Sequence, residues 1–220
     1  MPSTKQASRK RRSQAERRDE SERLLVEATL KVVAEQGVSA ATFDEIGKEA
    51  GFSRGLATQK FGSKHGLIEA VISYLHRKRE AIMEAEHVER MSAMEALTNY
   101  VDGHFRALET EYDSPAYFML LASTVADAMT QRELFAASHE RVRVRLRGLI
   151  ARGQTKGEIS RGIDSDASAL TIGSLLLGAS MQALVDPSTD LEPIRKTTIA
   201  ILTRALLVSP TRVSGALSRK

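Results

Sequence analysis

Hydrophobic residues recur at helical spacing along almost the whole chain. Between residues 25 and 33 they follow the i, i+3, i+4, i+7, i+8 pattern of one helix face, and Gly37 then supplies a stop. Residues 42–45 read Thr-Phe-Asp-Glu, a capping box with Thr42 as N-cap and Glu45 at N3. Two short helices and a longer one are predicted from there, and the longer one carries a buried stripe over residues 67–75.

Beyond about residue 90 the pattern predicts longer helices, over residues 92–111, from 114 onward, and over 131–153, 167–185 and 191–208. A second capping box, with Thr189 as its N-cap, opens the last of them. Residues 141–147 alternate Arg with apolar residues, as a strand does, but a helical stripe over 135–150 continues through them and favours a helix. No strand-rich segment occurs elsewhere, so the predicted fold class is all-α.

Residues 42–61 have the layout of a helix-turn-helix, two short helices joined by a tight turn over residues 51–53. Gly51 permits a positive φ in that turn, and Gly47 is small enough for the two helices to pack closely. The second helix then projects polar side chains that can hydrogen-bond to base edges: Arg54, Thr58, Gln59 and Lys60.

Residues 42–55 (TFDEIGKEAGFSRG) and 61–67 (FGSKHGL) closely resemble the DNA-binding signature of the TetR family of transcriptional regulators. The remainder resembles the family in the number and length of its helices. The resemblance implies a three-helix DNA-binding domain over residues 19–75 and a larger ligand-binding and dimerisation domain over 76–208. A basic flexible arm over 1–18 would precede them, and a loose tail over 209–220 would follow.

The resemblance also implies which residues grip DNA. Thr42 and Lys64 would meet phosphates, and residues 53–61 would form the recognition helix. The chain has Gln59-Lys60 where the family often has Tyr-His, so Gln59 could read adenine and Lys60 could reach phosphate or guanine. The predicted DNA-binding residues are Thr42, Ser53, Arg54, Gly55, Thr58, Gln59, Lys60 and Lys64, with Arg9, Lys10, Arg11 and Arg12 in the arm.

Charge is concentrated at the N-terminus. The 220 residues carry a net charge of +4, but the first 18 residues alone hold seven basic residues and one acid. Such an arm suits a polyanionic partner, and a solubilising tail would have the same composition. A hydrophobic content of 42% argues against wholesale disorder, and the lack of cysteine excludes disulfides and thiolate metal sites and fits the cytoplasm.

In the TetR family the middle helices enclose a small-molecule effector, and the last two helices pair with those of a second subunit. The pocket candidates are therefore Tyr100, His104, Phe105, Tyr117, Phe118, Leu121, Ala122, Val125, Met129, Phe135 and His139. This mixture suggests an apolar or aromatic ligand, although each apolar member could equally be plain core. The dimer candidates are Gly173, Leu177, Met181, Ile194, Thr198, Ile201 and Leu202.

The favoured function is a ligand-responsive, cytoplasmic repressor that binds a palindromic double-stranded DNA operator as a homodimer, with no catalytic activity, cofactor, metal or membrane. One alternative is a constitutive architectural DNA-binding protein, which would not need the large helical domain. A remote alternative is a hydrolase, because residues 51–55 match G-x-S-x-G with Ser53 as nucleophile. That motif needs a strand before the serine. The uncharged residues 167–185 could span a membrane, but their polar members and acidic flanks favour a buried or interface helix.

Overall fold

The structure is a computed structural model that describes residues 14–110, 112–126 and 131–207. Its α-helices are α1 (Gln14–Gln36), α2 (Phe43–Glu49), α3 (Arg54–Phe61), α4 (Lys64–Ala85), α5 (Ala93–Thr110), α6 (Asp113–Ala126), α7 (Arg132–Lys156), α8 (Ser165–Val185) and α9 (Leu191–Leu206). Two short 3-10 turns, η1 (Val38–Ala40) and η2 (Val88–Arg90), complete it. The described residues form no strand, only one isolated bridge, so the all-α prediction is confirmed.

Helix α1 separates two hydrophobic cores. Leu25 and Ala28 face α2, α3 and the start of α4, where they form a small core with Ile46, Ala57 and Leu67. Residues offset by one position on α1, such as Val26 and Leu30, face a second core built with α4, α6 and α7. Because both stripes repeat at helical spacing, a single helix joins the two cores.

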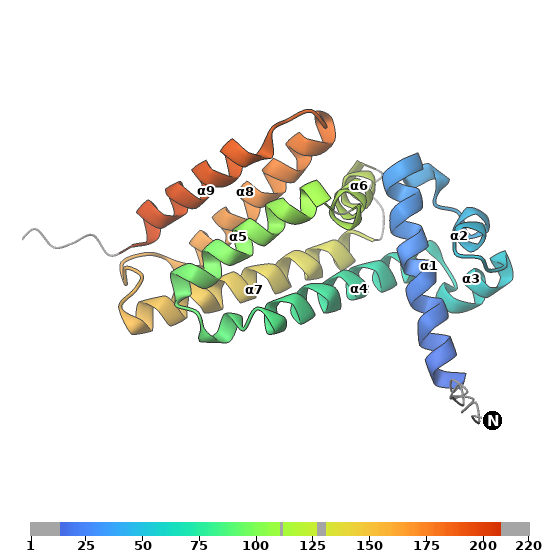
Figure 1. Ribbon diagram of the computed structural model, residues 1–220, viewed down its shortest axis with the longest axis horizontal. Coiled ribbons are helices and arrows are strands. Elements are labelled where there is room, and N and C mark those ends of the chain that lie inside the picture. Colours follow the sequence, from blue (N-terminus) through green and yellow to red (C-terminus); the bar gives the residue numbers. More distant parts are fainter. Residues whose placement is uncertain (1–13, 111, 127–130, 208–220) are drawn as a thin grey trace, which may run out of the picture.

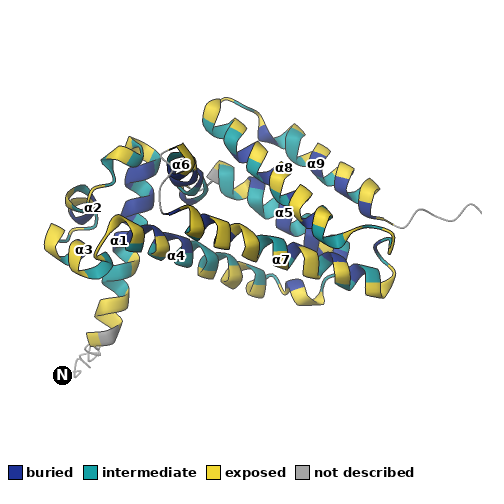
Figure 2. Ribbon diagram, turned by 180° about the vertical axis from the view of Figure 1, so that it is seen from behind, coloured by how far each residue is buried: buried dark blue, intermediate teal, exposed yellow. Residues whose placement is uncertain are grey.

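A third core lies among α5, α7, α8 and α9, away from α1 (Figure 1). The DNA-binding end predicted from the sequence, α1 to α3, sits at one end of the molecule, and α4 runs from it alongside α7 toward the other end. Buried residues line the inner sides of the helices, and exposed residues follow the outer sides of α8 and α9 (Figure 2).

Hydroxyl caps and glycines fix the geometry of the short helices. Thr42 and Ser53 each accept a hydrogen bond from the backbone N–H three residues ahead, at 3.2 Å, as the sequence predicts for helix N-caps. Gly51 has a φ of 73° in the turn between α2 and α3. A Cβ on Gly47 would lie 3.0 Å from the carbonyl oxygen of Phe52, so only glycine lets the turn pack on α2.

Several boundaries differ from the prediction. Helix α1 begins at Gln14, inside the predicted flexible arm, and α4 runs unbroken through the predicted domain boundary at residues 75–76. The N-cap of α9 is Asp190 rather than Thr189, because the Asp190 carboxylate accepts from the Glu192 N–H at 3.1 Å. Residues 141–147 are helical, within α7, as the longer periodicity indicates. The predicted tail over 209–220 lies outside the described residues.

Helix α8 is long and apolar enough to cross a membrane by length and composition alone. In the fold it packs against α7, α6, α5 and α9, and 28% of its apolar window is buried. One such helix is weak evidence for a membrane span, and the packing of α8 against four other helices is consistent with the predicted buried or interface helix.

Candidate functional site

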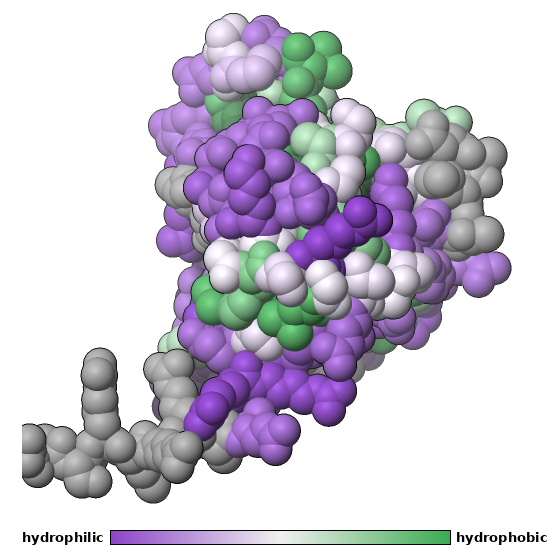
Figure 3. All heavy atoms as spheres, turned by 90° about the vertical axis from the view of Figure 1, so that its right-hand side faces the viewer, coloured by the Kyte–Doolittle hydropathy of each residue, from purple (hydrophilic) through white to green (hydrophobic). Residues whose placement is uncertain are grey.

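The outer face of α3 carries exposed polar side chains. Arg54, Thr58 and Gln59 are all exposed, and their spacing places them on adjacent positions of one side of the helix. Gly55 lies beside them in open space, since a Cβ there would approach only the Ser53 hydroxyl, at 3.7 Å. Hydrophilic residues cover most of this end of the molecule (Figure 3). The arrangement offers hydrogen-bonding groups and a close-approach position to an incoming ligand.

Two further predicted contacts flank α3. Thr42 is exposed at the start of α2, and Lys64 is exposed in the first turn of α4, just after the loop that ends α3. That loop depends on Gly66, because a Cβ there would lie 2.2 Å from the carbonyl oxygen of Phe61. The N-termini of α2 and α4, together with Lys64, lie on either side of the polar face of α3, and such groups are suited to binding phosphates.

Lys60 does not join this surface, which corrects the sequence prediction. Its side chain is only 8% exposed. The Lys60 ammonium donates a hydrogen bond to the Arg18 carbonyl oxygen at 2.5 Å and lies 3.8 Å from a Glu22 carboxylate oxygen, both on α1. Position 60 lies on the side of α3 that faces α1, so the cation ties the two helices together. The predicted arm residues Arg9, Lys10, Arg11 and Arg12 lie outside the described residues.

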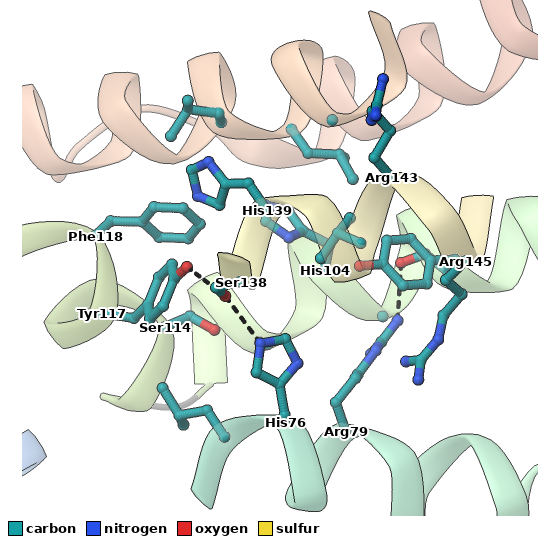
Figure 4. A pocket seen from close by; sticks show the side chains of 18 of the residues that line it. His76, Arg79, His104, Ser114, Tyr117, Phe118, Ser138, His139, Arg143 and Arg145 are labelled. Carbon is teal, nitrogen blue, oxygen red and sulfur yellow. Dashed lines mark hydrogen bonds between the residues drawn. The ribbon is translucent and has the colours of Figure 1, made fainter. Parts of the chain in front are cut away.

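A cavity of about 620 Å³ lies among α4, α5, α6, α7 and α8. Five of the predicted pocket residues line it, and they come from three different helices: Tyr100, His104, Tyr117, Phe118 and His139. Figure 4 shows the labelled side chains converging on this space from α4 on one side and from α5, α6 and α7 on the others. Its size is in the range of small-molecule sites.

The other pocket candidates lie elsewhere. Phe105, Leu121 and Phe135 are buried in the cores and do not line the cavity. Leu121 and Phe135 share a helix face with lining residues but lie one turn beyond them. Ala122 and Val125 are exposed on α6. Met129 is outside the described residues. Periodicity identifies an apolar stripe but does not say which part of it meets a cavity.

Polar residues of α4 and α7 line the cavity without having been predicted. The hydroxyl of buried Ser138 lies 2.9 Å from both the His76 Nε2 and the Tyr117 hydroxyl. Arg79 and Arg145 line the cavity beside them (Figure 4). The missed signal is the length of α4: its apolar stripe ends at Leu75, but the helix continues to Ala85 and presents polar residues to the cavity.

The cavity histidines are neutral at physiological pH. Burial lowers the pKa of His104 to about 4, with a smaller contribution from Arg79. The Ser180 hydroxyl donates to the Leu176 carbonyl oxygen at 2.8 Å, so His104 Nε2, 2.9 Å from Ser180 Oγ, is the donor in its pair. Burial also lowers the pKa values of His76 and His139 and raises the pKa of Tyr117 to about 12. These groups offer hydrogen bonds rather than charge.

The predicted dimer residues divide between exposed and buried positions. Ile201 is 53% exposed, whereas Thr198 and Leu202 are buried within the chain. Gly173 and Leu177 line the cavity, and Ile194 and Met181 are partly buried. The large apolar side chains that face outward on α8 and α9 without lining the cavity are Leu175, Val185 and Ile201, each more than 40% exposed, whereas Leu170 is 58% exposed but belongs to the cavity lining. Of the predicted dimer residues, only Ile201 is therefore exposed on these two helices.

The strand that a hydrolase would need before Ser53 is absent: α2 and a glycine turn precede this residue, and its hydroxyl caps α3. The G-x-S-x-G match is therefore part of the turn between α2 and α3.

Two family models match the chain. Residues 25–71 match the model for bacterial regulatory proteins of the tetR family, and residues 93–207 match the C-terminal model of BetI-type transcriptional repressors. Among curated proteins, the transcriptional regulator BetI of Escherichia coli strain K12 is 30% identical over 187 residues, which cover 83% of this chain and 89% of BetI. The regulator PksA of Bacillus subtilis is 23% identical over 163 residues, 74% of this chain and 78% of PksA.

Solved structures share the fold. A TetR-family regulator from Rhodococcus sp. superposes with a TM-score of 0.76 at 23% identity, covering 86% of this chain and 99% of that one. SmeT, solved in a complex with triclosan, gives a TM-score of 0.73 at 18% identity, covering 91% and 98%.

Proposed function

Since this chain belongs to the tetR family of bacterial regulatory proteins, we propose that it is a repressor that binds a palindromic DNA site as a homodimer and releases it when a small molecule fills the cavity. The protein is a DNA-binding transcriptional regulator and not an enzyme. Such a regulator acts on DNA in the cytoplasm, the location that the sequence favours.

The observation that carries the release mechanism is the continuity of α4. Its 22 residues span roughly 33 Å. Lys64 stands at its start beside α3, and Leu67 packs in the core of the DNA-binding end. Further along the same helix, His76 and Arg79 line the cavity. A ligand that shifts α4 therefore moves the base of the DNA-binding end.

The exposed apolar face of α8 and α9 supports the dimer. Val185 is 81% exposed and Ile201 is 53% exposed, and a second subunit packed on this face would shield both side chains from water. A twofold axis through this face would present two copies of α3 to two half-sites of a palindrome. The interface side chains in this proposal are Leu175, Val185 and Ile201, in place of Thr198 and Leu202.

The test is selection of duplex DNA from a random pool by the full chain, followed by footprinting of the enriched sequence. We expect an inverted repeat with half-sites about one helical turn apart. Arg54→Ala should bind the enriched duplex more weakly. Arg147→Ala, an exposed position on α7, is the control and should bind as the unmodified protein does. Failure to enrich any sequence would contradict specific binding.

A constitutive architectural DNA-binding protein is the second candidate, and the basic arm is the feature that favours it. The cavity of about 620 Å³ favours the ligand-responsive function instead. A small molecule that raises the melting temperature of the protein and lowers its affinity for the selected duplex would decide between the two.

A further inference from the structure

The described cavity lining has an excess of positive charge. Two carboxylates line it, Glu86 and Asp113, against five cations: Lys78, Arg79, Arg106, Arg143 and Arg145. Lys78 pairs with Asp113 at 2.7 Å, and Arg106 lies 3.8 Å from Glu86. Both lining carboxylates therefore already have a cation beside them, and none is left to attract a cationic ligand.

Arg79 differs from the other lining cations. Arg143 and Arg145 have carboxylate partners outside the cavity, at 2.7 Å from Asp166 and 3.2 Å from Glu80. Among the residues that the structure describes, Arg79 has no carboxylate within ion-pair distance. Burial lowers the pKa of Arg79, Tyr100 and the more distant Glu86 carboxylate raise it, and the cations Arg145 and Arg106 lower it again. A partly buried cation without a directly paired carboxylate favours a ligand that supplies one.

The surroundings of Arg79 hold the guanidinium in place without neutralising it. One nitrogen donates to the Tyr100 carbonyl oxygen at 3.1 Å, and the group lies 4.7 Å from the centre of the Tyr100 ring (Figure 4). Gly103 makes room for it, since a Cβ there would lie 2.7 Å from Arg79 Nη1. A guanidinium has five N–H groups, so donors remain for a planar anion.

The other end of the cavity is aromatic. The rings of Tyr117 and Phe118 meet edge to face with centroids 5.1 Å apart, and His104 lies 5.9 Å from Phe118. In Figure 4 Tyr117 and Phe118 lie on the side opposite Arg79 and Arg145. The histidines that line the cavity are neutral, so its unpaired positive charge lies at Arg79.

We infer that the cavity binds an amphipathic organic anion, an aromatic or apolar molecule whose carboxylate pairs with Arg79. The inference rests on the proposed function, because it names the chemical class of the effector. The carboxylate matches the planar fork of the guanidinium, and the body of the molecule packs against Tyr117 and Phe118. The sequence predicts an apolar or aromatic ligand, and the cavity adds that this ligand carries a negative charge.

The experiment compares 2-naphthoate with its neutral amide, 2-naphthamide, and with the cation 2-naphthylmethylamine, by calorimetric titration of the full chain without DNA. Inorganic phosphate tests the anion without an apolar body. We expect the carboxylate to bind about tenfold or more tighter than the amide, since hydrogen bonds to charged groups are the strong ones. The amine and phosphate should bind more weakly than the carboxylate.

Arg79→Gln should bring carboxylate and amide to within about twofold of each other, because the carboxylate loses its charged partner. Gly103→Ala should also reduce the preference, because the new methyl group displaces the guanidinium but keeps its charge. Arg147→Gln, on α7 outside the cavity, is the matched control and should keep the full preference.

Equal binding of carboxylate and amide to the wild-type protein, tighter binding of the amine or of phosphate, or no binding of the carboxylate would each overturn the inference. So would an unchanged preference in Arg79→Gln. Binding of the ligand-free protein and of Arg79→Gln to the selected duplex is measured separately. If the ligand-free wild-type protein does not bind the duplex, the proposed function is contradicted. If it binds the duplex but does not prefer the carboxylate over the amide, only the ligand class is contradicted.

Discussion

At the end of the molecule that carries α2 and α3, the polar side chains face solvent, whereas around the cavity they face one another. Arg54, Thr58 and Gln59 are exposed on a single short helix. His76, Ser138 and their neighbours form hydrogen bonds between helices that are far apart in the sequence. The first arrangement comes from one contiguous segment, and the second exists only once five helices are assembled.

The difference has an electrostatic consequence. A cation such as Lys64 on the exposed surface is solvated in the free protein, and in the proposed function it gains its partner only when DNA binds. Arg79 has already lost much of its water on folding, so a ligand that enters binds more favourably if it brings a negative charge. The exposed surface is therefore stable without a bound partner, whereas the cavity favours a ligand of negative charge.

The largest expected effect comes from separating the two subunits. Ile201→Glu places a charge in the proposed interface, where an unpaired charge costs several kcal/mol. Because Ile201 is 53% exposed in the single chain, the subunit should still fold. We expect a monomer in sedimentation that has lost tight DNA binding but still binds the cavity probe. Ala151→Glu, exposed on α7, is the control, and a dimeric Ile201→Glu protein would refute the interface.

Next in size is damage confined to the DNA-binding end. Gly66→Ala forces a Cβ against the Phe61 carbonyl oxygen, and we expect it to lower the free energy of unfolding by about 3 kcal/mol. Binding to the duplex should fall with it. Gly148→Ala, where a Cβ would meet nothing within 4 Å, should be neutral or stabilising. Urea unfolding measures both, and equal effects would show that the loop can adjust.

The cavity end should respond to pH through His104. In the unfolded chain this histidine has the ordinary pKa of 6.5, and in the folded protein burial lowers it to about 4. The unfolded chain therefore binds more protons below pH 6.5, and stability is lost as the pH falls from 6.5 toward 4. Between pH 7 and 5 the loss from this group should be about 2 kcal/mol. Denaturant unfolding at both values should show a smaller loss in His104→Gln; an identical loss would contradict the assignment.

At the recognition surface, Arg54→Ala should weaken binding to the selected duplex by about 2 kcal/mol and relax the preference at the base it contacts. Its side chain is exposed, so the stability of the free protein should not change. Fluorescence anisotropy with matched and mismatched duplexes measures this effect. Equal losses on both duplexes would mean that Arg54 contacts the backbone instead.

The smallest effect is expected for Lys64→Ala, which should weaken binding by about 1 kcal/mol on every duplex. The slope of log affinity against log salt concentration should fall by about one, because one fewer ion is released. Deleting residues 1–13, which hold five of the basic residues of the N-terminal arm, should flatten that slope further. A slope that stays the same after the deletion would mean that the arm does not contact DNA.

The same contrast explains what could be predicted from the sequence. The caps Thr42 and Ser53 and the turn glycine Gly51 act within a few residues of themselves, so local pattern locates the helix-turn-helix. His104 lines the cavity and Phe105, its neighbour, is buried in a core, although both lie on the same predicted helix. One residue is a 100° turn of a helix, and periodicity without neighbouring helices does not fix which face meets which partner.

Ile201 and Leu202 repeat this lesson on α9, where one is exposed and the next is buried. Arg79 was not predicted, because its role depends on Tyr100 and Gly103, which reach it from another helix. Charged residues near the middle of a long helix usually lie in solvent, and only the assembled cavity shows that this one does not.

The contact of Lys60 with α1 limits how freely the recognition helix can be exchanged. A graft that replaces residues 54–61 with those of a relative would also remove the cation that binds the Arg18 carbonyl and Glu22. The carbonyl is present whatever residue stands at position 18, but the carboxylate of Glu22 would remain without its cation. Redesign of DNA specificity in this protein must therefore treat positions 22 and 60 as one unit, and a chimera that keeps both should hold its new helix in the original orientation.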